Sequence, residues 1–280
     1  LAKTAGMPLF ILGGICSLEA DVFTVTRTNN TGPGSLPVVL SQANAAPGNQ
    51  IVEFAVGGVI TLAAPLPVIT NNLTVNGRVD TPVIISGGGS VPIFTFAAGT
   101  TNFLNRLHLV DGKTDGGGAA VNNAGTLYMT SCVLTNNAVP NGSGGAISNS
   151  GVMTIVFSEL SANQAVEGGA IYNLGNLTIS SSRILHNQSG NGGALYNVGD
   201  ATVGQTTISS NRATLGFGGG IFTTAKICVT ASAIVGNSAA GAAGYNGSGG
   251  GGGGGAGLGG GIFVSAGTAN FTNCTCVGNS

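Results

Sequence analysis

The densest group of ionisable side chains surrounds an apolar segment at residues 107–110. Arg106 and His108 alternate with leucines, so we expect them to share one outward face of a strand. Asp111, Lys113 and Asp115 follow within seven residues of His108. Acids, an amine and an imidazole placed together could form a small acid–base or cation site. We interpret the group as a solvated corner and keep the acid–base or cation site as the alternative.

Carboxylates are scarce in the rest of the chain. There are nine acidic residues in all, and residues 144–280 contain only Glu159, Glu167 and Asp200. Enzymes that cleave acidic polysaccharides need clustered carboxylates beside Arg or Lys, and calcium repeats need regularly spaced aspartates. We therefore predict no catalytic residue, no metal site and no cofactor. A polysaccharide lyase or hydrolase is the alternative from another class.

The five cysteines predict neither a disulfide framework nor a metal site. Cys132 and Cys274 stand at repeat positions that hold Ser or Thr elsewhere, and Cys276 replaces an aliphatic residue, so we expect core positions. Cys228 falls in an outward position, and a disulfide between subunits through Cys228 or Cys16 stays open. His108 and His186 are far from all of them in sequence.

A repeat that ends in asparagine dictates how these residues must be positioned. Successive members are 26, 24, 24, 26 and 42 residues apart, a period typical of solenoids. The asparagines are Asn137, Asn163, Asn187, Asn211, Asn237 and Asn279. We expect each to adopt left-handed backbone angles at a bend and to bond the equivalent amide one turn away, forming an asparagine ladder.

Aliphatic residues repeat with a spacing of two before each asparagine, as on one face of a strand. A further strand opens each repeat, in Gly-Gly-Ala-Ile-Tyr-Asn at 168–173 and related segments, with inward residues Val121, Ile147, Ile171, Leu195, Ile221 and Ile262. Three short strands per 24 residues, without helical periodicity, predict an all-β parallel β-helix of about ten turns. The glycines allow its tight corners.

An aromatic column lies beside the inward residues of that strand. Its members are Tyr172, Tyr196, Phe222 and Phe263 on successive repeats. Such a column can stack on itself, bind sugar rings or become buried against another subunit. We predict a contact face here, and surface glycans are one possible partner.

Length and composition indicate one elongated unit. The chain has 280 residues, 6% charged residues and a net charge of −1. Eight scattered Lys and Arg give no basic stripe, which argues against nucleic-acid binding. We divide it into an apolar segment at 1–20, an N-terminal module with irregular turns at 21–112, and regular repeats at 113–280 with a glycine-rich loop at 247–261.

The first twenty residues contain an apolar run too short to span a bilayer, so we predict no transmembrane span. Its apolar members are Leu9, Phe10, Ile11, Leu12 and Ile15. They could be the remnant of a secretory signal, a cap on the first turn, or an arm that packs on a neighbouring subunit.

Several segments resemble bacterial secreted β-helix proteins. Cys16-Ser17-Leu18-Glu19-Ala20 is similar to the CSLREA-type segment of that group but lacks its Arg. Residues 23–26, 32–36, 43–45 and 51–54 resemble its N-terminal module, and the Gly-Gly-Ala-Ile repeats also resemble polymorphic outer-membrane proteins. The resemblance implies a right-handed β-helix displayed outside the cell, often in adhesion. Ser35 and Pro37 should start a short capping helix at 38–44.

The final repeat reaches residues 276–280 without a helix or charged strand to shield its edge. Head-to-tail stacking of copies would cover such an edge and propagate into fibres. We therefore predict a secreted or cell-surface, non-enzymatic structural protein that forms extracellular filaments. A monomeric adhesin or glycan-binding β-helix is the nearest alternative.

Overall fold

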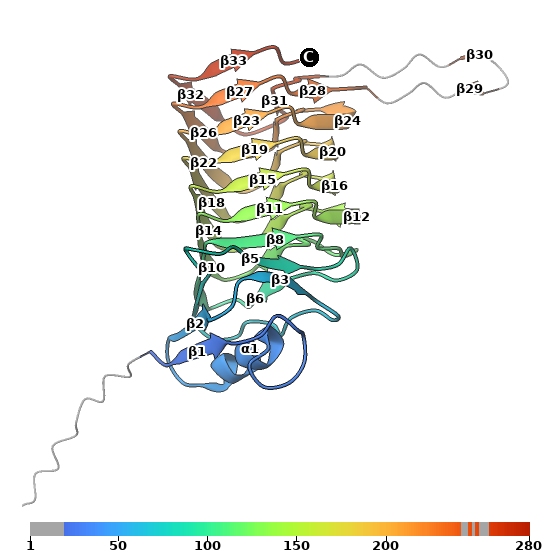
Figure 1. Cartoon of the computed structure of the whole chain (residues 1–280). Helices are drawn as coiled ribbons and strands as arrows, with labels where there is room; N and C mark the ends of the chain where they lie inside the picture. The colour runs from blue at the N-terminus through green and yellow to red at the C-terminus, as the bar shows by residue number, and fades with distance from the viewer. Residues whose placement is uncertain (1–19, 242–245, 248–249, 252–257) are drawn as a thin grey trace, which may run out of the picture.

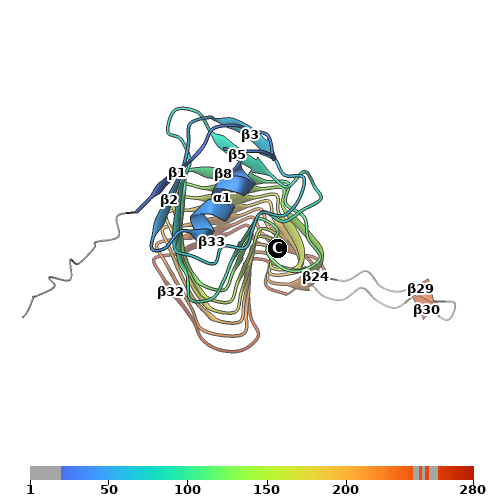
Figure 2. The ribbon, with the colours of Figure 1, turned by 90° about the horizontal axis from the view of Figure 1, so that it is seen from below.

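The chain folds into a parallel β-solenoid of about nine turns whose strands form stacked sheets (Figure 1). The structure is a computed structural model and describes residues 20–241, 246–247, 250–251 and 258–280. Successive turns lie almost in register when viewed along the axis (Figure 2). The predicted fold class is thus confirmed.

Four parallel sheets, called A, B, C and D, form the walls of the solenoid. Sheet A contains β1 (Val22–Val25), β2 (Gln50–Phe54), β4 (Leu73–Asn76), β7 (Thr101–Asn105), β10 (Thr126–Thr130), β14 (Val152–Val156), β18 (Asn176–Ser180), β22 (Asp200–Gly204), β26 (Ile227–Thr230) and β32 (Ala269–Thr272). Sheet B contains β3 (Gly58–Thr61), β5 (Val83–Ser86), β8 (Leu107–Val110), β11 (Val133–Thr135), β15 (Glu159–Ser161), β19 (Arg183–Leu185), β23 (Thr207–Ser209), β27 (Ala233–Val235) and β33 (Thr275–Val277). Sheet C contains β6 (Phe94–Phe96), β9 (Val121–Asn123), β13 (Ile147–Asn149), β17 (Ile171–Asn173), β21 (Leu195–Asn197), β25 (Ile221–Thr223) and β31 (Ile262–Val264).

Sheet D was not predicted from the sequence. It contains β12 (Ala138–Ser143), β16 (Gln164–Glu167), β20 (Gln188–Asn191), β24 (Arg212–Phe217) and β28 (Ser238–Ala239), so regular turns have four strands instead of three. Its strands differ in length, so their residues do not recur at one fixed spacing in the sequence. The register of sheet D slips between Val139 and Ser143 and again between Ser189 and Asn191. These irregularities explain why two repeats have 26 residues where others have 24.

The inward columns pack into one continuous core. In sheet A, Leu127, Ile179 and Val229 are buried, and Ile184 and Ile234 are buried in sheet B. Each column keeps its register from turn to turn, so every strand buries the same face. Burial of this apolar column, at roughly 25 cal/mol per Å², is the main stabilising contribution to the fold.

Helix α1 (Leu36–Ala45) covers the N-terminal end of the solenoid (Figures 1 and 2). It buries Leu36, Val39, Leu40 and Ala43 and contacts β1 and β2, as the predicted helix at 38–44 requires. Pro37 stands in its first turn, where no backbone N–H is needed. The hydroxyl of Ser35 makes no capping bond, so the backbone conformation alone begins the helix.

The prediction that the repeat asparagines adopt left-handed angles is wrong by one residue. Positive φ belongs to the residue before each asparagine: Asn136, Ala162, His186, Ser210, Gly236 and Gly278. The asparagine itself turns its side chain into the core, because a buried bend needs an amide that can bond the backbone. Before sheet C, glycines such as Gly144 and Gly168 supply the positive φ.

The glycine-rich insertion interrupts the turn between β28 and β31. Asn246–Gly247 (β29) and Gly250–Gly251 (β30) pair as antiparallel strands within it. Leu258 already bridges Phe217, and the following glycines bond the preceding corner, with Gly219 N–H donating to Gly259 O. The expected loop at 247–261 therefore ends earlier, because Gly259–Gly261 form the ordinary corner.

Candidate functional site

The predicted asparagine ladder is present as an unbroken chain of side-chain hydrogen bonds. Each amide nitrogen donates to the amide oxygen one turn further on, at 2.9 Å from Asn137 to Asn163 and 3.0 Å from Asn237 to Asn279. The same oxygen also accepts the backbone N–H of the previous asparagine. Asn187 is 1% exposed, so these bonds lie in the core. The ladder is structural and offers no group to a ligand.

A second asparagine ladder, which the sequence analysis missed, follows the inner edge of sheet C. Asn123, Asn149 and Asn173 each donate to the next amide oxygen at 2.8 Å, and Asn197 donates to Thr223 Oγ1. These residues end the Gly-Gly-Ala-Ile-Tyr-Asn motif, and their 24-residue to 26-residue spacing was visible in the sequence.

A third set of buried polar groups lies at the bend between sheets A and B. Ser158 Oγ accepts the backbone N–H of Cys132 at 3.0 Å, and Ser182 Oγ accepts that of Ser158 at 3.1 Å. Thr206 and Ser232 continue the series. Buried polar side chains of the repeats are thus used to hold one turn on the next.

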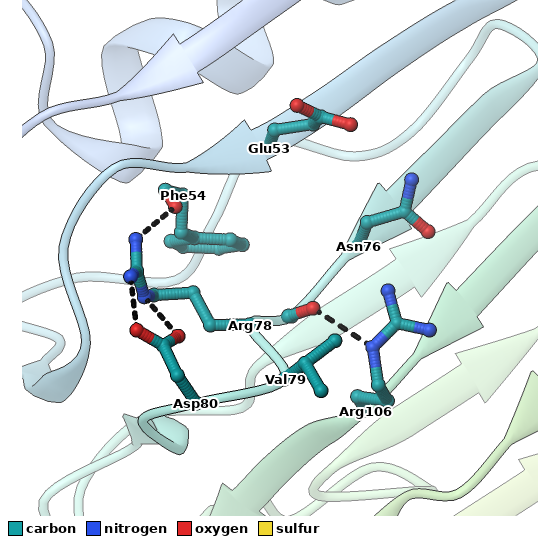
Figure 3. Close-up of a pocket in the computed structure, with 8 residues that line it drawn as sticks. Glu53, Phe54, Asn76, Arg78, Val79, Asp80 and Arg106 are labelled. Atoms are coloured by element: carbon teal, nitrogen blue, oxygen red, sulfur yellow. Dashed lines mark hydrogen bonds and ion pairs between the residues drawn. The ribbon is translucent and has the colours of Figure 1, made fainter.

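A charged pocket of about 340 Å³ lies near the N-terminal end (Figure 3). Arg78 forms an ion pair with Asp80 at 2.6 Å and donates to Phe54 O and Ala55 O. The hydrogen bond between the two side chains raises the pKa of Arg78 and lowers that of Asp80. Arg106 Nε donates to Gly77 O, and Glu53 and Asn76 complete the lining. Both arginines bond backbone carbonyls, so they brace irregular bends.

The five charged residues singled out from the sequence do not form one site. Arg106, at a bend with φ of 54°, and His108 line one depression together with Arg78. Asp111 and Lys113 line another, and Asp111 accepts hydrogen bonds from Ser86 and Asn136. Asp115 accepts a bond from Asn141. Each acid already has hydrogen-bond donors, an arrangement that favours a solvated corner over acid–base chemistry.

The structure also bears on metal binding and on the cysteines. Among the described residues, no group of three or more His, Cys, Asp or Glu side chains could hold a metal ion. Cys132 is buried, and burial raises the pKa of its thiol to about 11. Cys228 is half-buried in its outward column. In the last turn Cys274 is only half-buried and Cys276 is exposed, although both stand in inward columns.

The aromatic column forms a continuous stack on the outer face of sheet C. Ring centroids are 5.4 Å apart for Tyr172 and Tyr196, 4.5 Å for Tyr196 and Phe222, and 5.6 Å for Phe222 and Phe263. Phe217 of sheet D, absent from the predicted set, joins it with its centroid 5.0 Å from that of Phe263. Of the three roles considered, the geometry directly displays stacking of the rings on one another.

Glu167 lies beside the tyrosines of this stack. Burial raises the pKa of the Tyr172 hydroxyl, and the negative charge of Glu167 raises it further. Burial, then the charge of Glu167 and then the neighbouring Tyr172 raise the pKa of Tyr196. The carboxylate is half-buried and accepts a hydrogen bond from Ser143 Oγ at 3.3 Å. An acid therefore borders the otherwise apolar stack.

The predicted assembly arm, Leu9, Phe10, Ile11, Leu12 and Ile15, lies outside the described residues, as does Cys16. No helix within the described ranges is long and apolar enough to cross a membrane. No protein-family model matches the chain, and no curated protein matches it either. Strand pairing establishes the parallel β-solenoid, whereas the resemblance to secreted β-helix proteins stays a prediction.

Proposed function

We propose that this chain is a non-enzymatic structural protein, exported to the cell surface or beyond, whose solenoids stack head to tail into filaments. The observation that carries this proposal is the use of polar groups in the repeats. Both asparagine ladders and the serine series form hydrogen bonds between successive turns. A rod built in this way supplies stiffness, and a stiff repetitive rod suits a filament subunit.

The proposed contact uses the turn that contains β32 and β33. Phe271 is 41% exposed and Cys276 is exposed, whereas their counterparts one turn earlier, Val229 and Ile234, are fully buried. In the proposed filament these columns pack against the N-terminal end of a second copy, which helix α1 covers (Figure 1).

Electron microscopy of the full chain, with light scattering after dilution, tests this proposal. We expect fibres whose axial repeat is close to the length of one solenoid. Cys276→Asp should abolish the fibres, because it places a charge in the inward column of β33. Thr275→Asp, on the outward face of the same strand, should leave the fibres unchanged. Stable monomers of the wild-type chain would overturn the proposal.

The N-terminal segment has its own test. Removal of residues 1–20 should abolish assembly while the circular dichroism spectrum of the solenoid stays unchanged. Fibres that persist after this deletion would exclude the proposed arm but leave stacking through the last turn intact.

A further inference from the structure

The outer faces of sheets C and D meet in a corner that runs along several turns. On the side of sheet D the residues in register are Ser143, Glu167, Asn191 and Phe217. On the side of sheet C they are Ser148, Tyr172, Tyr196 and Phe222. Phe217 lies 6.4 Å from Phe222 between ring centroids, so the two faces bend toward each other.

Among the described residues, Tyr172 at the N-terminal end of the stack has an aromatic neighbour on one side only. Tyr172 is the first ring of the column, and its other neighbour in register is Ser148. A serine side chain has only two heavy atoms beyond the backbone and cannot cover a phenol ring. The ring faces of Tyr196 and Phe222 are occupied by their neighbours, so Tyr172 offers the free π surface.

The same turn supplies a negative charge without a cationic partner. Within the described part of the chain, ion pairs join Arg78 to Asp80 and Arg183 to Glu159, and none involves Glu167. In the next turn the side-chain oxygen of Asn191 is buried without a donor. In this corner Glu167 therefore has no cationic partner, and the side-chain oxygen of Asn191 has no hydrogen-bond donor.

We propose that this corner binds the alkylammonium side chain of a lysine from a partner protein. The ammonium donates hydrogen bonds to the Glu167 carboxylate and lies against the free face of Tyr172, where a cation–π attraction adds to the ion pair. The methylene stem packs along the apolar side of the corner. An anion is repelled by Glu167, and a neutral sugar leaves the carboxylate without its counter-charge.

The test uses the full chain and a fluorescein-labelled nine-residue Gly/Ser peptide with three lysines, followed by fluorescence anisotropy. The control peptide has the same lysines acetylated at Nζ, which removes only the charge. We expect binding of the lysine peptide at low ionic strength and at least a tenfold weaker affinity for the acetylated peptide. Equal affinity for the two peptides, or no binding of either, would overturn the proposal.

Variants separate this site from general charge attraction. Glu167→Gln should weaken binding of the lysine peptide about tenfold, whereas Glu159→Gln, which removes a carboxylate on sheet B, should leave it unchanged. Ser148→Tyr extends the stack by one ring and covers the free face of Tyr172 without removing any charge. We expect it to weaken binding to a similar extent, and unchanged binding in Ser148→Tyr would refute the role of the ring face.

Discussion

Replacing Asn187 by alanine tests whether the asparagine ladder holds the turns together. The Asn187 amide nitrogen donates to Leu160 O at 3.0 Å, Leu185 O at 3.1 Å and Asn211 Oδ1 at 2.9 Å. Its oxygen accepts the backbone N–H and the side-chain amide of Asn163, both at 2.9 Å. Alanine removes all five contacts at a buried position, and the three made by the nitrogen share its two hydrogens.

The expected loss follows from what each partner retains. Asn163 Nδ2 still donates to Leu134 O, and Asn211 Oδ1 still accepts from the Asn187 backbone, so these groups lose only part of their bonding. The backbone N–H of Asn163 loses its acceptor in a buried place, which costs about 1–3 kcal/mol by itself. With the other bonds, we expect Asn187→Ala to lower the free energy of unfolding by about 4 kcal/mol.

Equilibrium unfolding in urea, followed by circular dichroism, measures this change. With an m-value of about 3 kcal/mol/M, the midpoint should fall by roughly 1.3 M. Asn176→Ala is the matched control, since Asn176 is exposed one sheet away and its side chain makes no hydrogen bond. It should change the free energy of unfolding by less than about 0.5 kcal/mol. Equal midpoints for Asn187→Ala and Asn176→Ala would refute the ladder's contribution to stability.

Three further substitutions examine the corners, the aromatic stack and the buried thiol. Gly168 (φ 62°) and Gly236 (φ 63°) both have left-handed angles, but only at Gly168 would a Cβ collide with the carbonyl of Ile171. Gly168→Ala should therefore lower the free energy of unfolding, measured in urea, by at least about 3 kcal/mol, and Gly236→Ala should lower it by about 1 kcal/mol. Equal losses in the two variants would contradict the collision at Gly168. Tyr196→Ala breaks two ring contacts and should lower the free energy of unfolding by about 1–3 kcal/mol. Tyr128→Ala breaks one contact, with Phe103, and should lower the free energy of unfolding by less. Burial raises the pKa of the Cys132 thiol from the ordinary 9.0 to about 11. The neutral thiol therefore contributes fully to the free energy of unfolding below pH 9, and this contribution is lost as the pH rises toward 11. Urea unfolding at pH 8 and pH 10.5 measures this loss of stability, which should be absent in Cys132→Ser. If the variant loses as much stability as the wild type, other groups cause the loss.

The regular strands were predictable because their residues repeat with two periods at once. A spacing of two marks the buried face of a strand, and a spacing of 24–26 marks the next turn. Leu134, Leu160 and Ile184 satisfy both conditions, and their strands pair in the predicted order. Sheet D could not be found in this way, because its strands vary in length and its register slips at Val139 and Ser189.

The candidate sites were less predictable than the fold. The column Tyr172, Tyr196, Phe222 and Phe263 was visible, because its spacing equals the repeat. The sequence pattern does not link Phe217 and Glu167 to this column. Both belong to sheet D and lie near the stack only because sheets C and D meet at a corner. The charged residues at 106–115 are close in sequence, yet bends separate them into different depressions.

The sequence by itself determined the parallel solenoid, the inward columns and the positions of the asparagine ladder. These features arise from contacts between equivalent residues of successive turns, and such contacts leave a period in the sequence. Only the tertiary structure decided which residue of each bend takes the positive φ, where sheet D lies, and which side chains meet across the corner. The reason is physical: contacts between different walls of a turn depend on the angle at each bend, and residues that meet there need share no period.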